Sequence, residues 1–234
     1  MNSNRRTAII VGVLYIVGTV TGILSVVLYS PILNDPDYLT RVSANANQIV
    51  IGALFVLTMG LALAMVPVMM FPIFRKHNEA LALGYVVFRG ALETVTYIAL
   101  VISRLLLILV SQEYVAAGAP DAPYFQTLGA LLLKGHDSIS SILIIVFSLG
   151  ALILYYLFYQ SKLIPRWISG WGFFAIILHL ATGFLAMFAH IGPFSTISIV
   201  MNLPIGVQEM VMAVWLIVKG FNPSVIASKS PHVE

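Results

Sequence analysis

The stretch LALGYVVFRGALETVTYIALVISRLLLILV, residues 81–110, decides the fold of this chain. It is dominated by apolar side chains, yet it carries Arg89, Glu93 and Arg104. A bilayer core of about 30 Å is crossed by roughly 20 helical residues, so the stretch is long enough to span a membrane. Charged residues inside a spanning helix are costly and usually face protein or water.

The charges of this stretch fall on one side of the predicted helix. At about 100° per residue, Glu93 lies roughly 40° from Arg89, and Arg104 lies roughly 60° from it. Thr96 and Tyr97 fall on the same broad stripe. Because a polar stripe of this length cannot face lipid, we expect this helix to occupy the centre of a helix bundle.

Composition extends the membrane interpretation to the whole chain. Apolar residues make up 60% of the 234 residues and charged residues 9%, whereas soluble domains carry about 25% charged residues. The fold class is therefore an all-α polytopic membrane bundle, forming a single transmembrane domain over residues 1–234. Six spans are predicted, at about 8–29, 48–71, 81–110, 138–159, 168–189 and 197–218.

The positive residues predict the orientation of the spans. Cytoplasmic loops carry an excess of Lys and Arg, and with six spans the two sides of this protein differ sharply. We therefore expect both termini in the cytoplasm and a multi-pass location in the cytoplasmic membrane. The outer side has Arg41 and Lys134, and the predicted inner side has Arg5, Arg6, Arg75, Lys76, Lys162, Arg166, Lys219 and Lys229.

The longest connection, Ser111 to Asp137, is predicted on the outer side. Residues 116–123 are rich in small residues and proline, which is typical of an irregular loop. Residues 124–134 contain a leucine-rich run that favours a short helix at the membrane interface. Such a helix could be a lid over an outward-facing cavity, but simple anchoring is the preferred interpretation.

The last span adds a second carboxylate to the membrane interior. Glu209 lies ten residues before Lys219, and Arg89 lies ten residues after Glu79, so the two should sit at similar depth. Asn202 is on the same helical face as Glu209. A cluster of Arg89, Glu93 and Glu209 would carry a net charge of −1, which a bound cation or proton could balance. A structural ion-pair network is the competing interpretation.

A second polar group is expected near the outer face, and it consists of Arg104, His136, Asp137 and His190. Arg104 and Asp137 are predicted to form an ion pair that is structural rather than functional. Imidazole and carboxylate suit zinc or iron, so His136, Asp137 and His190 are a weaker candidate for a metal site. No metal or other cofactor is predicted for the protein as a whole.

Three segments carry a resemblance to a known family. They are FPIFRK at Phe71–Lys76 with the following Arg89 and Glu93, the His136 helix ending in Ser161–Arg166, and Pro204–Gly220 with Glu209. Over nearly the whole chain the sequence resembles the bacterial and archaeal membrane proteins of domain-of-unknown-function family 4386. The resemblance implies a multi-helix membrane protein and emphasises Arg89, Glu93, His136 and Glu209, but it supplies no activity.

These observations favour a membrane protein that binds or moves a small solute, ion or proton. The expected site comprises Arg89, Glu93, Glu209, Asn202 and Tyr97. The alternative is an intramembrane enzyme acting on a lipid or apolar substrate through the outer group, so whether the protein is an enzyme stays open, with non-enzymatic function preferred. A structural or accessory subunit is a third interpretation.

The expected partners follow from the same composition. The lipid bilayer is one partner, and a homodimer is another, because 234 residues make a small transporter. Nucleic-acid binding has no support, since the basic residues are few and follow the membrane boundary.

Overall fold

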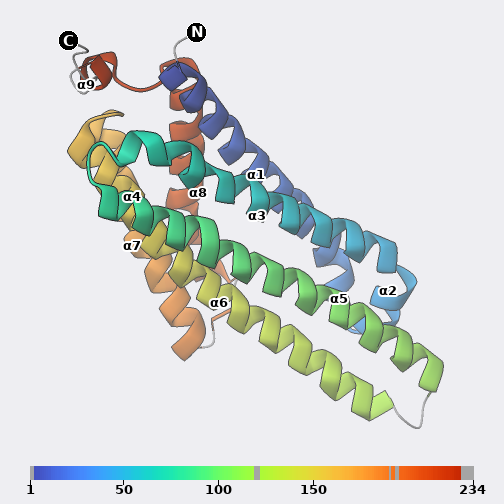
Figure 1. Ribbon diagram of the computed structural model, residues 1–234. Helices are drawn as coiled ribbons and strands as arrows, with labels where there is room; N and C mark the ends of the chain where they lie inside the picture. The colour runs from blue at the N-terminus through green and yellow to red at the C-terminus, as the bar shows by residue number, and fades with distance from the viewer. Residues whose placement is uncertain (1–2, 119–121, 190, 193–194, 228–234) are drawn as a thin grey trace.

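The computed structural model describes residues 3–118, 122–189, 191–192 and 195–227, and its regular structure over these residues is entirely helical (Figure 1). Six helices are long and apolar enough to cross a membrane, which confirms the predicted fold class and number of spans. The first four are longer than predicted, and the last two match their predicted lengths within a few residues. The six helices are α1 (Ser3–Leu33), α3 (Ala46–Phe74), the continuous helix Glu79–Ala117, α6 (Ala122–Ser161), α7 (Arg166–Ala189) and α8 (Thr196–Val218).

The third span is built from three consecutive pieces. It begins as α4 (Glu79–Tyr85), widens into a π-helix, η1 (Val86–Leu92), and continues as α5 (Glu93–Ala117). Asn78 caps its start, because the Asn78 side chain accepts a hydrogen bond from the Leu81 N–H at 3.0 Å. A π-helical turn interrupts the regular hydrogen-bond ladder and is often found at functional positions.

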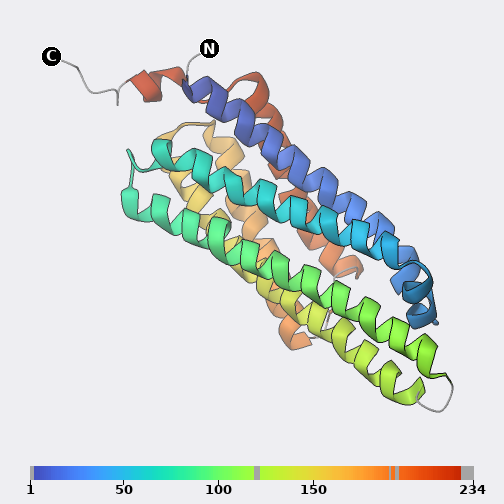
Figure 2. The same cartoon turned by 45° about the vertical axis from the view of Figure 1, so that its right-hand side comes forward.

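The six spanning helices form a closed ring (Figures 1 and 2). Each spanning helix packs against its neighbours in the chain, and α8 closes the ring by packing against α1. The prediction of a central third helix is therefore wrong, because that helix is one member of the ring. Its polar stripe still avoids lipid, since Arg89 and Glu93 are each only 1% exposed.

The short helix α2 (Tyr38–Ala44), which the sequence did not predict, lies between α1 and α3 and packs against α5. Asp35 precedes it and pairs with Arg41, at 3.0 Å between Oδ2 and Nε. The Asp37 backbone N–H also donates to Asp35 at 2.9 Å. That backbone hydrogen bond and the Arg41 guanidinium lower the pKa of the Asp35 carboxyl below its ordinary value.

The outer connection differs from its prediction. Residues 124–134 are helical as expected, but they form the first turns of α6, not a separate interfacial helix. The predicted loop at 116–123 is also shorter, since α5 reaches Ala117 and α6 starts at Ala122. Proline is tolerated in the first turn of a helix, so Pro123 does not interrupt α6. The α5–α6 hairpin consequently projects beyond α7 and α8 (Figures 1 and 2).

The two chain ends lie at the same end of the bundle (Figure 1). Arg5 joins them, because its guanidinium donates to the carbonyls of Leu216 (2.9 Å), Ile217 (2.5 Å) and Val218 (3.2 Å). These are carbonyls that the last turn of a helix leaves without partners. Arg5 thus caps α8 in addition to contributing positive charge.

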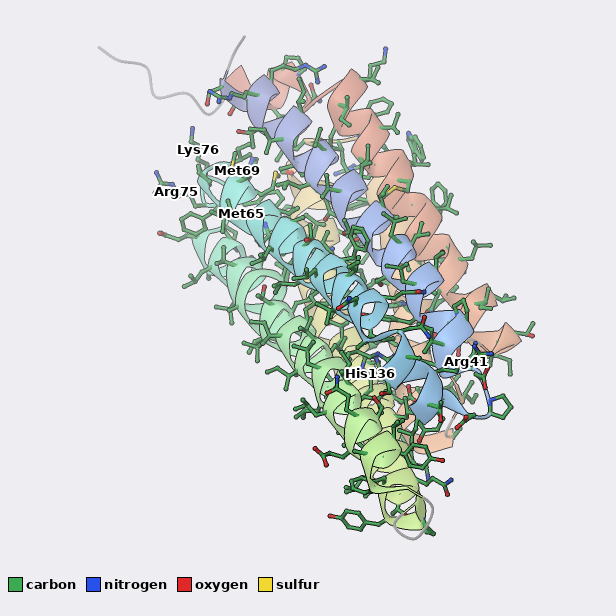
Figure 3. All side chains as sticks on the ribbon, turned by 90° about the vertical axis from the view of Figure 1, so that its right-hand side faces the viewer. Arg41, Met65, Met69, Arg75, Lys76 and His136 are labelled. Carbon is green, nitrogen blue, oxygen red and sulfur yellow. The ribbon has the colours of Figure 1, made fainter. Side chains whose placement is uncertain are left out.

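The positive residues Arg75 and Lys76 lie at the opposite end of the bundle from Arg41, as the sequence predicts (Figure 3). Figure 3 shows Arg75 and Lys76 at the end that holds the chain termini, and Arg41 far from them. Lys229 lies outside the described residues. Which side of the membrane each end faces stays a prediction.

Candidate functional site

Arg89 binds two carboxylates inside the ring. Its Nη1 lies 3.1 Å from Glu93 Oε2, and its Nη2 lies 3.3 Å from Glu209 Oε1. The side chains of Arg89 and Glu93 are each 1% exposed, and that of Glu209 is 14% exposed. The three residues therefore meet in one cluster, as the sequence predicts, and it is here called the central cluster.

The backbone around Arg89 is part of a π-helical turn that packs closely against α6. Arg89 lies in the π-helical turn, and Glu93 follows one turn later at the start of α5. Gly150 of α6 faces this turn so closely that a Cβ there would lie 3.2 Å from Arg89 N and Cβ. The glycine lets α6 approach the Arg89 backbone, and close approach of helices at small residues is common in membranes.

Aromatic rings complete the surroundings of the guanidinium. The Arg89 Cζ lies 4.3 Å from the centroid of the Phe147 ring and 5.8 Å from that of Tyr15. Phe147 in turn makes an edge-to-face contact with His179, at 5.0 Å between ring centroids. A cation over an aromatic face is stabilised by the ring quadrupole, most strongly when both are desolvated.

The central cluster retains unused hydrogen-bonding capacity. Both carboxylate oxygens of Glu93 and the Nε and Nη1 atoms of Arg89 are buried without a hydrogen bond of good geometry among the described residues, although Tyr97 is close enough to interact with the Glu93 carboxylate. The 3.1 Å contact between Arg89 and Glu93 has the length of an ion pair without the angles of a hydrogen bond. Buried polar atoms are almost always hydrogen-bonded, so such atoms call for an explanation.

A neutral network that the sequence analysis missed lies beside the central cluster. The Tyr155 hydroxyl donates to Gln208 Oε1 at 2.6 Å, and Gln208 Nε2 donates to the Ile168 carbonyl at 3.0 Å. Gln208 is fully buried. A polar residue in a span, directly before Glu209, was the available signal for Gln208, whereas Tyr155 resembles ordinary apolar filler in sequence.

Packed aromatic side chains separate the central cluster from the end that holds the chain termini. Phe74 contacts Tyr85 and Phe158 edge-to-face, at centroid distances of 5.9 and 5.3 Å. All three side chains are at most 1% exposed. Tyr85 lies one turn before Arg89 in the third span, so this aromatic group packs next to the central cluster on that side.

A cavity of about 470 Å³ lies farther along the third span, from Tyr97 onward. The three residues of the central cluster do not line it. This outer cavity lies between α1, α3, α5 and α6. Tyr97, one turn beyond Glu93 in α5, lines it, as do Arg104, His136 and Asp137. Three of the four residues predicted for the outer polar group therefore gather around one cavity, and His190 lies outside the described residues.

The predicted ion pair between Arg104 and Asp137 is wrong, since no nitrogen–oxygen distance within 4.0 Å joins these two described residues. The Arg104 guanidinium instead stacks on the Tyr29 ring, at 5.0 Å from Cζ to the centroid. An aromatic face can hold a guanidinium without a carboxylate. Both charged residues are thus available to the outer cavity.

His136 contacts a serine that the sequence analysis did not consider. Ser103 Oγ lies 2.7 Å from His136 Nδ1 and donates its hydrogen bond to the Leu100 carbonyl at 2.8 Å. A hydroxyl has one proton, so the His136 ring donates to Ser103 in this arrangement. If Ser103 were a nucleophile, its hydroxyl proton would instead have to pass to the His136 ring. Within the described ranges, no three His, Cys, Asp or Glu side chains gather closely enough to hold a metal ion.

Asn202 does not join the central cluster, contrary to its predicted place in that site. Its Oδ1 lies 2.8 Å from His179 Nδ1, which links α8 to α7. Asn202 also lines a further cavity of about 550 Å³ between α6, α7 and α8, together with Asp137 and Ser140. Asp137 and Ser140 line the outer cavity as well, so the two cavities are neighbours along α6.

One of the comparisons with known proteins identifies a family. The model of a domain of unknown function, DUF4386, matches residues 10–220. The chain belongs to this family. The match spans all six membrane helices and includes the central cluster and the outer cavity. No curated protein and no solved structure gave a match, so the DUF4386 assignment supplies a family without an activity.

Proposed function

We propose that this membrane protein binds a proton or a small cation at the central cluster and moves it across the membrane. The observation that carries the proposal is the meeting of two carboxylates on one buried guanidinium, with Glu93 fully buried and Glu209 partly buried. With all three groups ionised, the cluster has a net charge of −1. Uncompensated charge in a membrane interior is costly, so one additional positive charge, as a proton or a cation, would balance it.

The Glu93 carboxylate supports the same proposal, because both of its oxygens are buried and only Oε2 lies within ion-pair distance of Arg89. These oxygens provide two acceptors in a buried place, and carboxylate oxygen is the donor type that hard cations and protons prefer. Tyr97 lies between Glu93 and the outer cavity along α5. The route from outside would therefore pass the outer cavity, reach Tyr97 and end at Glu93.

The distribution of cavities supports a transport cycle. The outer cavity reaches Tyr97, one turn from Glu93, while on the other side of the central cluster Phe74 packs against Tyr85 and Phe158. A site near the middle of the membrane that opens to one side at a time is the general arrangement of secondary transporters. Movement of the third span at its π-helical turn would be one way to open the closed side.

Flux into proteoliposomes tests this proposal, with protons, Na⁺ and K⁺ as separate probes. We expect the wild-type protein to carry at least one of them. Glu93→Gln and Glu209→Gln each neutralise one carboxylate while keeping its shape, so each should reduce the flux by more than about tenfold.

The control is Glu113→Gln, which neutralises an exposed carboxylate at the outer end of α5. It should leave the flux unchanged. Wild-type flux in both cluster variants would contradict the proposal, and so would the absence of flux and of binding for all three probes in the wild-type protein.

A further inference from the structure

A second charged cavity lies at the end of the bundle that holds the chain termini. Its volume is about 480 Å³, and it forms between the α6–α7 connection and the segment that follows α8. The two segments are tied together, because the Asn222 N–H donates to the Leu163 carbonyl at 2.8 Å. Lys162, Arg166 and Lys219 line this basic cavity, together with Trp215.

The charge of the basic cavity is not neutralised by the protein. None of the described residues that line it is acidic. Lys162, Arg166 and Lys219 are exposed, and none of them forms an ion pair with a described residue. Arg166 instead stacks over the Tyr159 ring, at 4.8 Å from Cζ to the centroid. Three cationic residues therefore contribute to the lining of one cavity.

The backbone at Lys162 is an independent sign of a built site. Lys162 has a φ of 57°, in the left-handed region that non-glycine residues rarely occupy. Across the same cavity, Gly220 ends α8 with a φ of 73°. Glycine is the usual residue at such helix ends because it has no Cβ. The α6 end has a lysine where α8 has the usual glycine, which indicates a use for the lysine side chain.

The position of the basic cavity suits a lipid headgroup. Trp215 lines it, and the Trp167 ring lies 6.5 Å away, perpendicular to the Trp215 ring. Tryptophan is enriched at the level of the headgroups. Basic pockets between membrane helices bind the phosphate groups of anionic lipids.

From these observations we infer that the basic cavity binds a phosphate group, supplied by an anionic phospholipid or by free phosphate. Lys162, Arg166 and Lys219 contact the phosphate oxygens, and the two tryptophan side chains lie along the acyl chains when the source is a lipid. General enrichment of positive residues on one membrane side explains their presence at this end. It does not explain why three of them line one cavity, nor the left-handed lysine.

Binding to the full-length protein in detergent tests the inference, with phosphatidylglycerol, phosphatidylcholine and inorganic phosphate as probes and native mass spectrometry as the readout. Phosphatidylglycerol should be retained more strongly than phosphatidylcholine. Lys162→Asn and Lys219→Gln should each weaken its retention about fivefold, the effect of one basic residue near an anionic surface. Asparagine tolerates the left-handed backbone, so Lys162→Asn should keep or raise the unfolding temperature while binding falls.

The matched control is Arg6→Gln, which removes one exposed positive charge at the same end without lining the cavity. It should bind phosphatidylglycerol as the wild type does. Competition by inorganic phosphate would identify the phosphate group alone as the ligand, and lipid binding without competition would identify the whole lipid. Equal losses in Arg6→Gln, or no loss in either lysine variant, would overturn the inference.

Discussion

At the scale of single residues, the charges were predictable and their neighbours were not. Arg89, Glu93 and Glu209 stand out in sequence because an ionisable side chain in a membrane span is expensive and needs a partner. Phe147 and Tyr155 contact the same region, but aromatic residues in a span have no such signature. The Arg104–Asp137 pair failed as a prediction because Tyr29 holds the guanidinium in another way.

Arg89 should be the least replaceable residue of the central cluster. Arg89→Met removes the cation and leaves two buried carboxylates facing each other. Breaking a buried ion pair by removing one partner typically costs about 3–5 kcal/mol, so the unfolding temperature should fall strongly. Thermal unfolding in detergent measures this.

The comparison variant replaces the whole cluster by Arg89→Met, Glu93→Gln and Glu209→Gln together. It leaves no uncompensated charge, so it should recover much of the lost stability while binding neither protons nor cations. A triple variant with normal transport would assign the cluster a purely structural role.

At the scale of elements, the spans were predictable and their irregularities were not. A long apolar segment predicts a membrane helix by its length. The π-helical turn at Val86–Leu92 has no comparable signature, because it adds backbone width without a special residue type. The continuation of α6 through residues 124–134 was missed because Pro123 suggested a loop, although proline is acceptable where a helix begins.

The contact between the π-helical turn and α6 gives a prediction at this scale. In Gly150→Ala, the new methyl group would lie 3.2 Å from Arg89 N, so either α6 or the turn must move. Overpacking of this kind costs about 1–3 kcal/mol. The unfolding temperature should fall, and proton or cation binding at the central cluster should weaken with it.

Gly206→Ala in α8 is the matched control, because nothing lies within 4 Å of the Cβ that it adds. Alanine is a better helix former than glycine by about 0.5–1 kcal/mol, so this variant should keep or gain stability. Equal effects of the two substitutions would show that α6 does not hold the Arg89 turn.

At the scale of the whole molecule, the number of membrane-spanning helices followed from the sequence, and their closure into a ring did not. A polar stripe indicates that a helix face avoids lipid, but it cannot distinguish a central helix from a ring whose members face inward. The packing of α8 against α1 settles this question. The homodimer and the location in the cytoplasmic membrane stay predictions.

The orientation can be tested directly, because the chain has no cysteine. A single cysteine introduced by Glu113→Cys or by Arg6→Cys places a label at opposite ends of the bundle, and both positions are exposed. In intact cells, a membrane-impermeant maleimide should label the Glu113→Cys variant and spare the Arg6→Cys variant. The reverse pattern would invert the proposed orientation, and labelling of both only after lysis would place the protein in another membrane.

The central claim is that the cluster of Arg89, Glu93 and Glu209 holds one additional positive charge. Infrared spectroscopy of the purified protein at neutral pH, with and without Na⁺ or K⁺, counts protonated carboxyl groups most directly. We predict one protonated carboxyl in cation-free buffer, absent from Glu93→Gln and from Glu209→Gln because either change balances the remaining charges. A wild-type protein with neither a protonated carboxyl nor a bound cation would contradict it.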